Sequence, residues 1–473
     1  MRHKLQKFES FVQTLLPHEV GYLLQVQQFQ DADNLDILRR IHHNCHPLNQ
    51  AVDFDTELDK RKYSNLKKWI LTRLEAIDVD LSFHNLITLE EQIMTDAIMP
   101  ETEQAFLQTL ADYQGMSFYF SKLYEVARRF QQYLAIRMRF QDEGQVSAFL
   151  SVYEPAYTMA QEVQAQLDQA TQDLTRQYSR YDTETRKWEP WLHQTFFDPR
   201  VEGHSRYLAV VRLTMLYINY REYDKLRTLY DALDEVFRTG AFYSRRLLVN
   251  YYANRLILHS KFGEWDEAIM YGYLSIRHQT TEYLQYITNL GAVLLRCDRA
   301  AEALDLMQGA VPEMRKTQNF HNKTGFAAFY IKSLYDNGRQ KQALQYAESF
   351  LRSYQSRILA QRWHLFFSVY LQVLTHQQQY AKVLSLVRKH KLLEKEKEYR
   401  KRPAYLPTLH WYYLVARYQE GQINQEKLAA ALAEDWEQVK LDMHKYGLLR
   451  ELVEELYPHA PQVFAPYRRE ISL

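Results

Sequence analysis

The sequence predicts an all-α fold, in which an irregular helical N-terminal region precedes an α-α superhelix of helical hairpins. Glycine and proline are scarce, with 13 and 12 residues among 473, and both residues interrupt regular helices. Apolar residues recur at three- and four-residue spacing over long stretches, which is the spacing of one buried helix face. A chain of this length exceeds one ordinary compact core, so we expect several domains or an elongated stack of repeats.

Residues 1–190 are expected to form the helical N-terminal region, which has no clear internal period. Helices are predicted over 4–15, 18–29, 33–45, 56–76, 83–97, 101–113 and 116–140, with Pro17, Pro47 and Pro100 between them. Residues 156–188 contain neither proline nor glycine, so they could form one long helix of about 50 Å. The segment 189–204, which contains Pro190, Pro199 and Gly203, is the best candidate for a domain boundary.

The C-terminal region, residues 205–455, contains weak repetition of one plan. In residues 251–278 the apolar periodicity stops at Gly263 and resumes near Glu264, which predicts a helix, a tight turn and an antiparallel helix. Residues 286–311 and 325–351 repeat this plan. The residue of the second helix on which the units align is, in order, Leu226, Ala268, Ala303, Ala343, Val383 and Leu428. We expect Gly291 and Ala303 to be buried where adjacent helices touch.

These units resemble tetratricopeptide repeats (TPR), which are stacked helix–turn–helix hairpins of about 34 residues. Other α-solenoid hairpins are the alternative for the outer units. The resemblance implies a concave groove lined by the first helix of each hairpin, which binds peptides or protein surfaces. Carried onto the aligned units, it places in this groove Asn250, Ser260, Gln285, Thr288, Lys332, Tyr335, Gln372 and Thr375. The alternative is a groove that is only solvated, or one filled by the chain's own N-terminal helices.

The expected function is that of a non-enzymatic scaffold or adaptor that binds a protein or peptide partner. No GxGxxG, GxxxxGK[ST], HExxH or GxSxG motif occurs, so no cofactor and no standard catalytic site are predicted. Two alternatives stay open. The first is a regulator whose repeats sense a peptide or small ligand while the N-terminal helices act as effector, and the second is a nucleic-acid-binding helical repeat protein.

Charge and cysteine content bear on partners and compartment. The 59 basic and 58 acidic residues nearly cancel, which makes nucleic acid an unexpected partner and argues against membrane binding. Two distant cysteines, Cys45 and Cys297, form no disulfide framework and favour a reducing compartment. No apolar segment has the length of a membrane span, so we expect a cytoplasmic protein. A homo-oligomer remains open.

Four local patterns each have a functional and a structural interpretation. His42, His43, Cys45 and His46 are soft metal ligands, but no second Cys/His pair completes a set, so we expect a helix end and no metal. Asp31 or Asp33, in the run DADNLD, is expected to cap a helix. Basic clusters at 60–73 and 388–402 are expected to be solvated helix faces rather than phosphate sites. The aromatic segment 188–197 is expected to seal a junction between domains.

Overall fold

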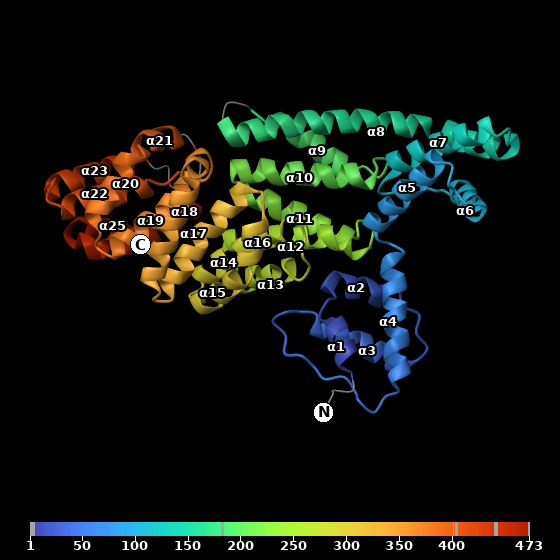
Figure 1. The fold of residues 1–473 in the computed structure, drawn as a ribbon, viewed down its shortest axis with the longest axis horizontal. Helices are drawn as coiled ribbons and strands as arrows, with labels where there is room; N and C mark the ends of the chain where they lie inside the picture. The colour runs from blue at the N-terminus through green and yellow to red at the C-terminus, as the bar shows by residue number, and fades with distance from the viewer. Residues whose placement is uncertain (1–4, 181–183, 401, 403–404, 439–442, 472–473) are drawn as a thin grey trace. The chain divides into compact units, whose positions relative to one another are not determined.

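The computed structural model describes residues 5–180, 184–400, 402, 405–438 and 443–471, and confirms the all-α prediction. The described chain is 79% helical and contains no strand. It divides into two compact units, residues 1–252 and 253–473, and the segment 189–204 lies inside the first unit (Figure 1).

The first unit contains eleven α-helices and the start of a twelfth among its described residues. Their bounds are α1 (Gln6–Val12), α2 (Pro17–Val26), α3 (Ala32–Asn44), α4 (Lys60–Glu75), α5 (Val79–Met94), α6 (Pro100–Ala111), α7 (Phe120–Ile136), α8 (Phe140–Arg180), α9 (Glu189–Phe197), α10 (Gly203–Tyr220), α11 (Tyr223–Arg238) and α12 (Arg245–Phe262). Helices α7 and α8 pair as a hairpin, α5 packs on α7, α6 on α8, and α10 packs on both α8 and α9.

The predicted long helix is displaced along the sequence. Helix α8 begins at Phe140, passes through Pro155 and ends at Arg180, spanning 41 residues. Beyond it, residues 186–188 form a short 3₁₀ turn, and the indole N–H of Trp188 donates to Asp173 over 2.9 Å. The chain therefore returns along α8 instead of continuing it, a reversal that helical periodicity alone does not predict.

The buried side chain of Glu19 and the partly buried side chain of His18 fix α2 within the first unit. The Glu19 carboxylate accepts hydrogen bonds from the Leu16 backbone N–H, the Tyr243 hydroxyl and Arg245 Nε, at 2.8, 2.6 and 2.8 Å. The next residue toward the N-terminus, His18, lies with Nε2 2.9 Å from Asp234 Oδ1. These contacts join residues more than 200 positions apart in sequence.

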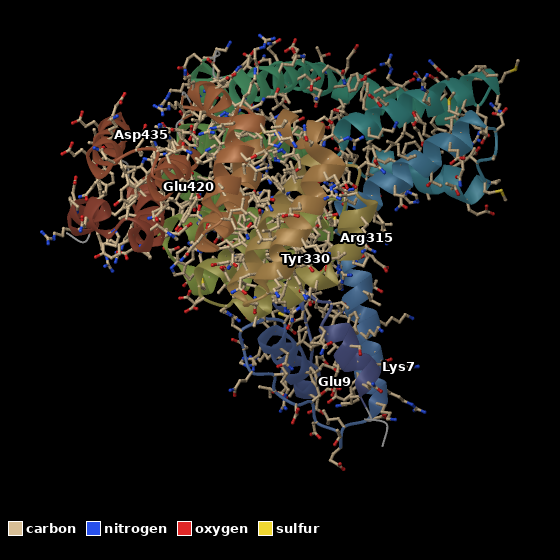
Figure 2. All side chains as sticks on the ribbon, turned by 60° about the vertical axis from the view of Figure 1, so that its left-hand side comes forward. Lys7, Glu9, Arg315, Tyr330, Glu420 and Asp435 are labelled. Carbon is tan, nitrogen blue, oxygen red and sulfur yellow. The ribbon has the colours of Figure 1, made fainter. Side chains whose placement is uncertain are left out.

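The second unit continues from α12 as a row of helical hairpins. Its helices are α13 (Trp265–Ser275), α14 (Tyr283–Arg296), α15 (Ala300–Gly309), α16 (Val311–Lys316), α17 (Phe320–Asp336), α18 (Gln340–Ala360), α19 (Trp363–His376), α20 (Tyr380–Lys389), α21 (Leu392–Tyr399), α22 (Thr408–Gln419), α23 (Gln425–Gln438), α24 (Met443–Leu456) and α25 (Pro461–Ile471). Four hairpins, α14/α15, α17/α18, α19/α20 and α22/α23, follow one another, and the first helices α14, α17, α19 and α22 pack in that order. Figure 2 marks Tyr330 on α17 and Asp435 on α23.

The alignment of the hairpins is confirmed by burial and by backbone conformation. All six aligned residues are buried, from Leu226 at 2% exposed to Ala303 at 0%, and Gly291 is buried as predicted. The turn before the second helix contains a residue with φ between +54° and +73°. This backbone conformation favours glycine, and in two of the hairpins an aspartate or a glutamine adopts it. This residue lies five positions before the aligned one in the pairs Gly263 and Ala268, Asp298 and Ala303, Gly338 and Ala343, and Gln378 and Val383.

A buried polar cluster joins α21, α22 and α23. Glu396 is 1% exposed, and its carboxyl accepts a hydrogen bond from the Tyr405 hydroxyl at 3.3 Å. Asp435 accepts from Arg400 Nη2 at 3.1 Å and lies 2.6 Å from His410 Nδ1. Burial raises the pKa of Glu396 to about 7, although the nearby cations of His410 and Arg400 oppose the shift.

Candidate functional site

A groove of about 420 Å³ crosses the first helices of the four hairpins in the second unit. Its lining comes from α14, α17, α19, α22 and α24, with Asp298 and Leu406 from the connecting segments. We call it the α14–α24 groove. Its lining residues are Ala292, Leu295, Arg296, Asp298, Phe329, Lys332, Ser368, Val369, Gln372, Leu406, Thr408, Tyr412, Leu448, Glu451, Leu452 and Glu455.

The lining residues follow the hairpin repeat. Ala292, Lys332 and Gln372 each lie 11 positions before the aligned residue of their hairpin, at 303, 343 and 383. Phe329 and Val369 lie three positions earlier again, which places them one turn away on the same helix face. Equivalent positions of three successive hairpins therefore meet in one groove. In the second and third of these hairpins, the polar residue, Lys332 or Gln372, lies one turn from an apolar one, Phe329 or Val369.

A carboxylate is held in place at one end of this groove. Glu455 on α24 accepts a hydrogen bond from Gln372 Nε2 at 2.8 Å and another from the Tyr412 hydroxyl. His376 Nε2 lies 3.4 Å from the same carboxylate, and its other ring nitrogen lies 3.0 Å from the Tyr335 hydroxyl. Burial, with the charge of Glu455, raises the pKa of Tyr412 well above its usual value. This hydroxyl therefore stays protonated and keeps donating, so the carboxylate position is preorganised.

Further charged groups of both signs line the groove. Lys332 pairs with Asp336 of its own helix, at 3.1 Å. Arg296 and Glu451 are exposed, and within the described part of the chain neither forms an ion pair. The groove can thus offer a guanidinium and a carboxylate to a ligand without breaking an existing pair.

Two of the eight residues predicted to line a groove do so. Lys332 and Gln372 line it, and Tyr335 contributes indirectly through its contact with His376. Thr288 and Thr375 are 2% and 0% exposed, and neither lines this groove. In α14 the equivalent of Lys332 is Ala292, one helical turn after Thr288, and the TPR resemblance did not place this alanine in the groove.

The remaining predicted residues lie outside the groove lining. Gln285 donates from Nε2 to Asn289 at 2.7 Å, and the Ser260 hydroxyl donates to the backbone oxygen of Ile257. Asn250 belongs to the first unit, where its side-chain oxygen accepts a hydrogen bond from Tyr207 at 3.1 Å.

Sequence reasoning missed the contribution of α24. Glu451 and Glu455 belong to a helix beyond the last aligned hairpin, so no repeat position points to them. No sequence pattern marks Tyr412, whose hydroxyl donates to a carboxylate 43 residues away. In contrast, the 40-residue interval between Lys332 and Gln372 is a sequence pattern that would have identified Ala292.

The lining supplies binding groups, and its Ser368 hydroxyl is not activated as a nucleophile. No histidine or cysteine is among the lining residues. The Ser368 Oγ is buried and has no hydrogen-bond partner among the described residues, so no base contacts it. Nucleophilic catalysis by a hydroxyl requires such a base within hydrogen-bond reach.

The four local patterns of the sequence mostly fill structural roles. Asp31 is confirmed as the N-cap of α3, accepting from the backbone N–H of Asp33. Lys62 of the first basic cluster pairs with Asp31, at 2.8 Å. The Cys45 thiol is buried and donates to the backbone oxygen of His42. Among the described residues, no group of three or more His, Cys, Asp and Glu side chains could hold a metal ion.

The aromatic segment lies inside the first unit, and its rings have different environments. Trp188 and Trp191 meet edge to face, with ring centroids 5.9 Å apart. Phe196 is 1% exposed and Phe197 is 50% exposed. The segment therefore contributes to packing within this unit.

Among the described helices, none combines the length and the apolar character needed to cross a membrane. Comparison of the chain with protein-family models, with curated proteins and with solved structures finds no significant match. The chemistry and the repeat geometry of the α14–α24 groove are therefore the basis for proposing a function.

Proposed function

We propose that this chain is a non-enzymatic, TPR-like scaffold of the cytoplasm that binds an extended segment of a protein partner in the α14–α24 groove. One observation carries the proposal: equivalent positions of successive first helices, Ala292, Lys332 and Gln372, line a single groove. A repeated lining offers similar chemistry at regular steps, which suits a ligand that is itself a chain. A compact metabolite would not need three repeats.

The groove chemistry suggests what the partner segment contains. Phe329 and Val369 form an apolar surface in the groove that can receive an aliphatic or aromatic side chain of the partner. The amide of Gln372 and the hydroxyl of Thr408 suit the N–H and C=O groups of an extended backbone. Arg296 can pair with a carboxylate of the partner, and Glu451 with a lysine or arginine. The partner segment is thus expected to carry both charges around an apolar residue.

The first experiment identifies what occupies the groove. A photo-crosslinking amino acid, p-benzoylphenylalanine, replaces Glu451 in the full chain, in its native host, and the crosslinked peptides are sequenced by mass spectrometry. The control carries the same amino acid in place of Lys341, which is exposed on the second helix α18. A segment of one protein crosslinked from Glu451 and absent from the Lys341 control is the expected result.

The second experiment measures binding of the synthetic segment to the purified chain. Lys332→Glu should weaken it by about tenfold or more, because it reverses a charge at the groove wall. Lys341→Glu makes the same change outside the groove and should leave affinity unchanged. Equal affinity for both variants and the native chain, or crosslinks only to small molecules or nucleic acid, would refute the proposed function.

A further inference from the structure

Helix α5 in the first unit exposes an unusual amount of apolar surface. Only Val79 and Ile93 are buried in this helix. Leu81, Phe83 and Ile87 are 36–38% exposed, and Met94, at the C-terminal end of α5, is 62% exposed. A helix on the surface of a globular protein normally turns its apolar face toward the core, so α5 has more apolar surface than its neighbours cover.

A groove of about 650 Å³ opens between α5, α6 and the start of α7. We call it the α5–α6 groove. Helices α5 and α6 supply most of the lining, and Leu123 of α7 with residues of the segment before α7 supplies most of the rest. The lining residues are Val79, Ser82, Asn85, Leu86, Leu89, Thr102, Ala105, Phe106, Thr109, Tyr113, Ser117, Phe118, Tyr119, Leu123 and Ala241.

None of these fifteen lining residues is an acid, a lysine, an arginine or a histidine, although a quarter of the whole chain is charged. Leucine and phenylalanine side chains alternate with hydroxyl and amide groups. Such a lining favours an apolar occupant that needs a few weak polar contacts.

One rim of the groove is acidic. Glu101 and Asp112 lie four residues before Ala105 and seven residues after it, and this spacing places all three on one side of α6. Both carboxylates are exposed, and neither forms an ion pair with a described residue. Asp112 accepts only an amide hydrogen bond, from Gln108 at 2.7 Å. The rim therefore offers two negative charges about three helical turns apart, with no cation of the described chain to balance them.

We propose that the α5–α6 groove receives an amphipathic helix of a partner protein, with an uncharged apolar stripe flanked by lysine or arginine. The lining of α5 extends from Val79 to Leu89, about 15 Å of helix, which matches about three turns of a guest helix. The apolar stripe would pack on the lining side chains of α5, such as Leu86 and Leu89, and the flanking cations would meet Glu101 and Asp112. This site is independent of the α14–α24 groove and of the function proposed for it.

The test uses two fluorescein-labelled synthetic peptides of about 14 residues, roughly four helical turns. Both peptides carry leucine at positions with i, i+3, i+4 and i+7 spacing. The remaining positions are lysine in the first peptide and glutamate in the second. Fluorescence anisotropy with the purified full chain should show saturable binding of the lysine peptide and binding of the glutamate peptide that is weaker by about tenfold or more.

Two sets of variants locate the binding. Ala105→Trp fills the groove and should weaken binding of the lysine peptide by about tenfold or more. Gln104 is exposed on the same helix outside the lining, so Gln104→Trp should leave the affinity unchanged. The double variant Glu101→Lys with Asp112→Lys alters only exposed positions, so it keeps the test valid if Ala105→Trp does not fold. It should reverse the preference between the two peptides.

Several results would overturn the proposal. These are the absence of saturable peptide binding, equal affinity for the two peptides, and peptide binding that neither Ala105→Trp nor the charge reversal alters. Binding of the neutral dye N-phenyl-1-naphthylamine that is lost in Ala105→Trp, without peptide binding, would identify the occupant as a small apolar molecule and would also overturn it.

Discussion

The close packing of three helices at Gly272 predicts that even one added methyl group destabilises the second unit. Gly272 lies on α13, and its nearest side chains belong to Leu256 of α12 and Leu290 of α14. A Cβ at this position would stand 2.5 Å from Leu290 Cδ1 and 2.8 Å from Leu256 Cδ1. Both leucines are at most 1% exposed, so neither can turn toward solvent to make room.

The magnitude follows from two opposing contributions. Gly→Ala in a helix interior stabilises by about 1 kcal/mol through backbone entropy, while overpacking a full core costs about 1–3 kcal/mol. Gly272→Ala should therefore lower the free energy of unfolding by about 1 kcal/mol. Gly291→Ala is the matched control, because its Cβ would meet mainly the flexible side chain of Met307, with Sδ at 3.2 Å. That variant should be neutral or more stable by about 0.5 kcal/mol.

Urea denaturation of the full chain, followed by circular dichroism at 222 nm, measures both variants. For a unit of this size, 1 kcal/mol corresponds to about 2–4 °C in melting temperature, so a thermal scan provides a second reading. The reasoning is refuted if Gly272→Ala is as stable as the native chain, or if Gly291→Ala proves the less stable of the two variants.

Three further predictions concern stability. Ala303→Phe should destabilise the second unit by about 1–3 kcal/mol, and an unchanged urea midpoint would contradict the hairpin alignment. Glu19→Ala removes the acceptor for Tyr243 and Arg245 and should cost about 3 kcal/mol; calorimetry showing less than about 1 kcal/mol would contradict the role given to this carboxylate. Glu396 keeps its proton to about pH 7 when folded but loses it near 4.5 when unfolded, so stability should fall by about 3 kcal/mol as pH rises through this window. Glu396→Gln should remove most of that fall in urea titrations at pH 5 and pH 8.

Local residue chemistry predicted most helix boundaries in the N-terminal region. Prolines begin α2 and α6, and an aspartate of the DADNLD run caps α3 as predicted. The starts predicted at 56 and 83 lie instead at Lys60 and Val79, where Asp59 and Asp78 cap α4 and α5. These features act within one turn of the chain, so a sequence shows them directly. The end of α8 was placed incorrectly because the reversal after Arg180 depends on a contact between Trp188 and Asp173, and helical periodicity does not report such a contact.

The candidate site was predicted only in part. Lys332 and Gln372 were placed in a groove by the TPR resemblance, and both are polar positions at equivalent places of two apolar first helices. Thr288 and Thr375 satisfied the polarity criterion as well, yet both are buried. A threonine in a helix can donate to the backbone carbonyl of the preceding turn, as Thr288 does to Leu284, so a hydroxyl does not by itself indicate a solvated position.

The sequence by itself determined that the chain is helical, where hairpins turn, and which small or branched residue of each second helix is buried. Those properties follow from the 3.6-residue period and from the residues that tolerate a turn, and both act over a few residues. Only the tertiary structure decided that Glu455 of α24 completes the α14–α24 groove and that α5 and α6 leave an uncharged groove between them. Glu455 lies 83 residues from its partner Gln372, and their meeting depends on how whole helices pack, which no local pattern encodes.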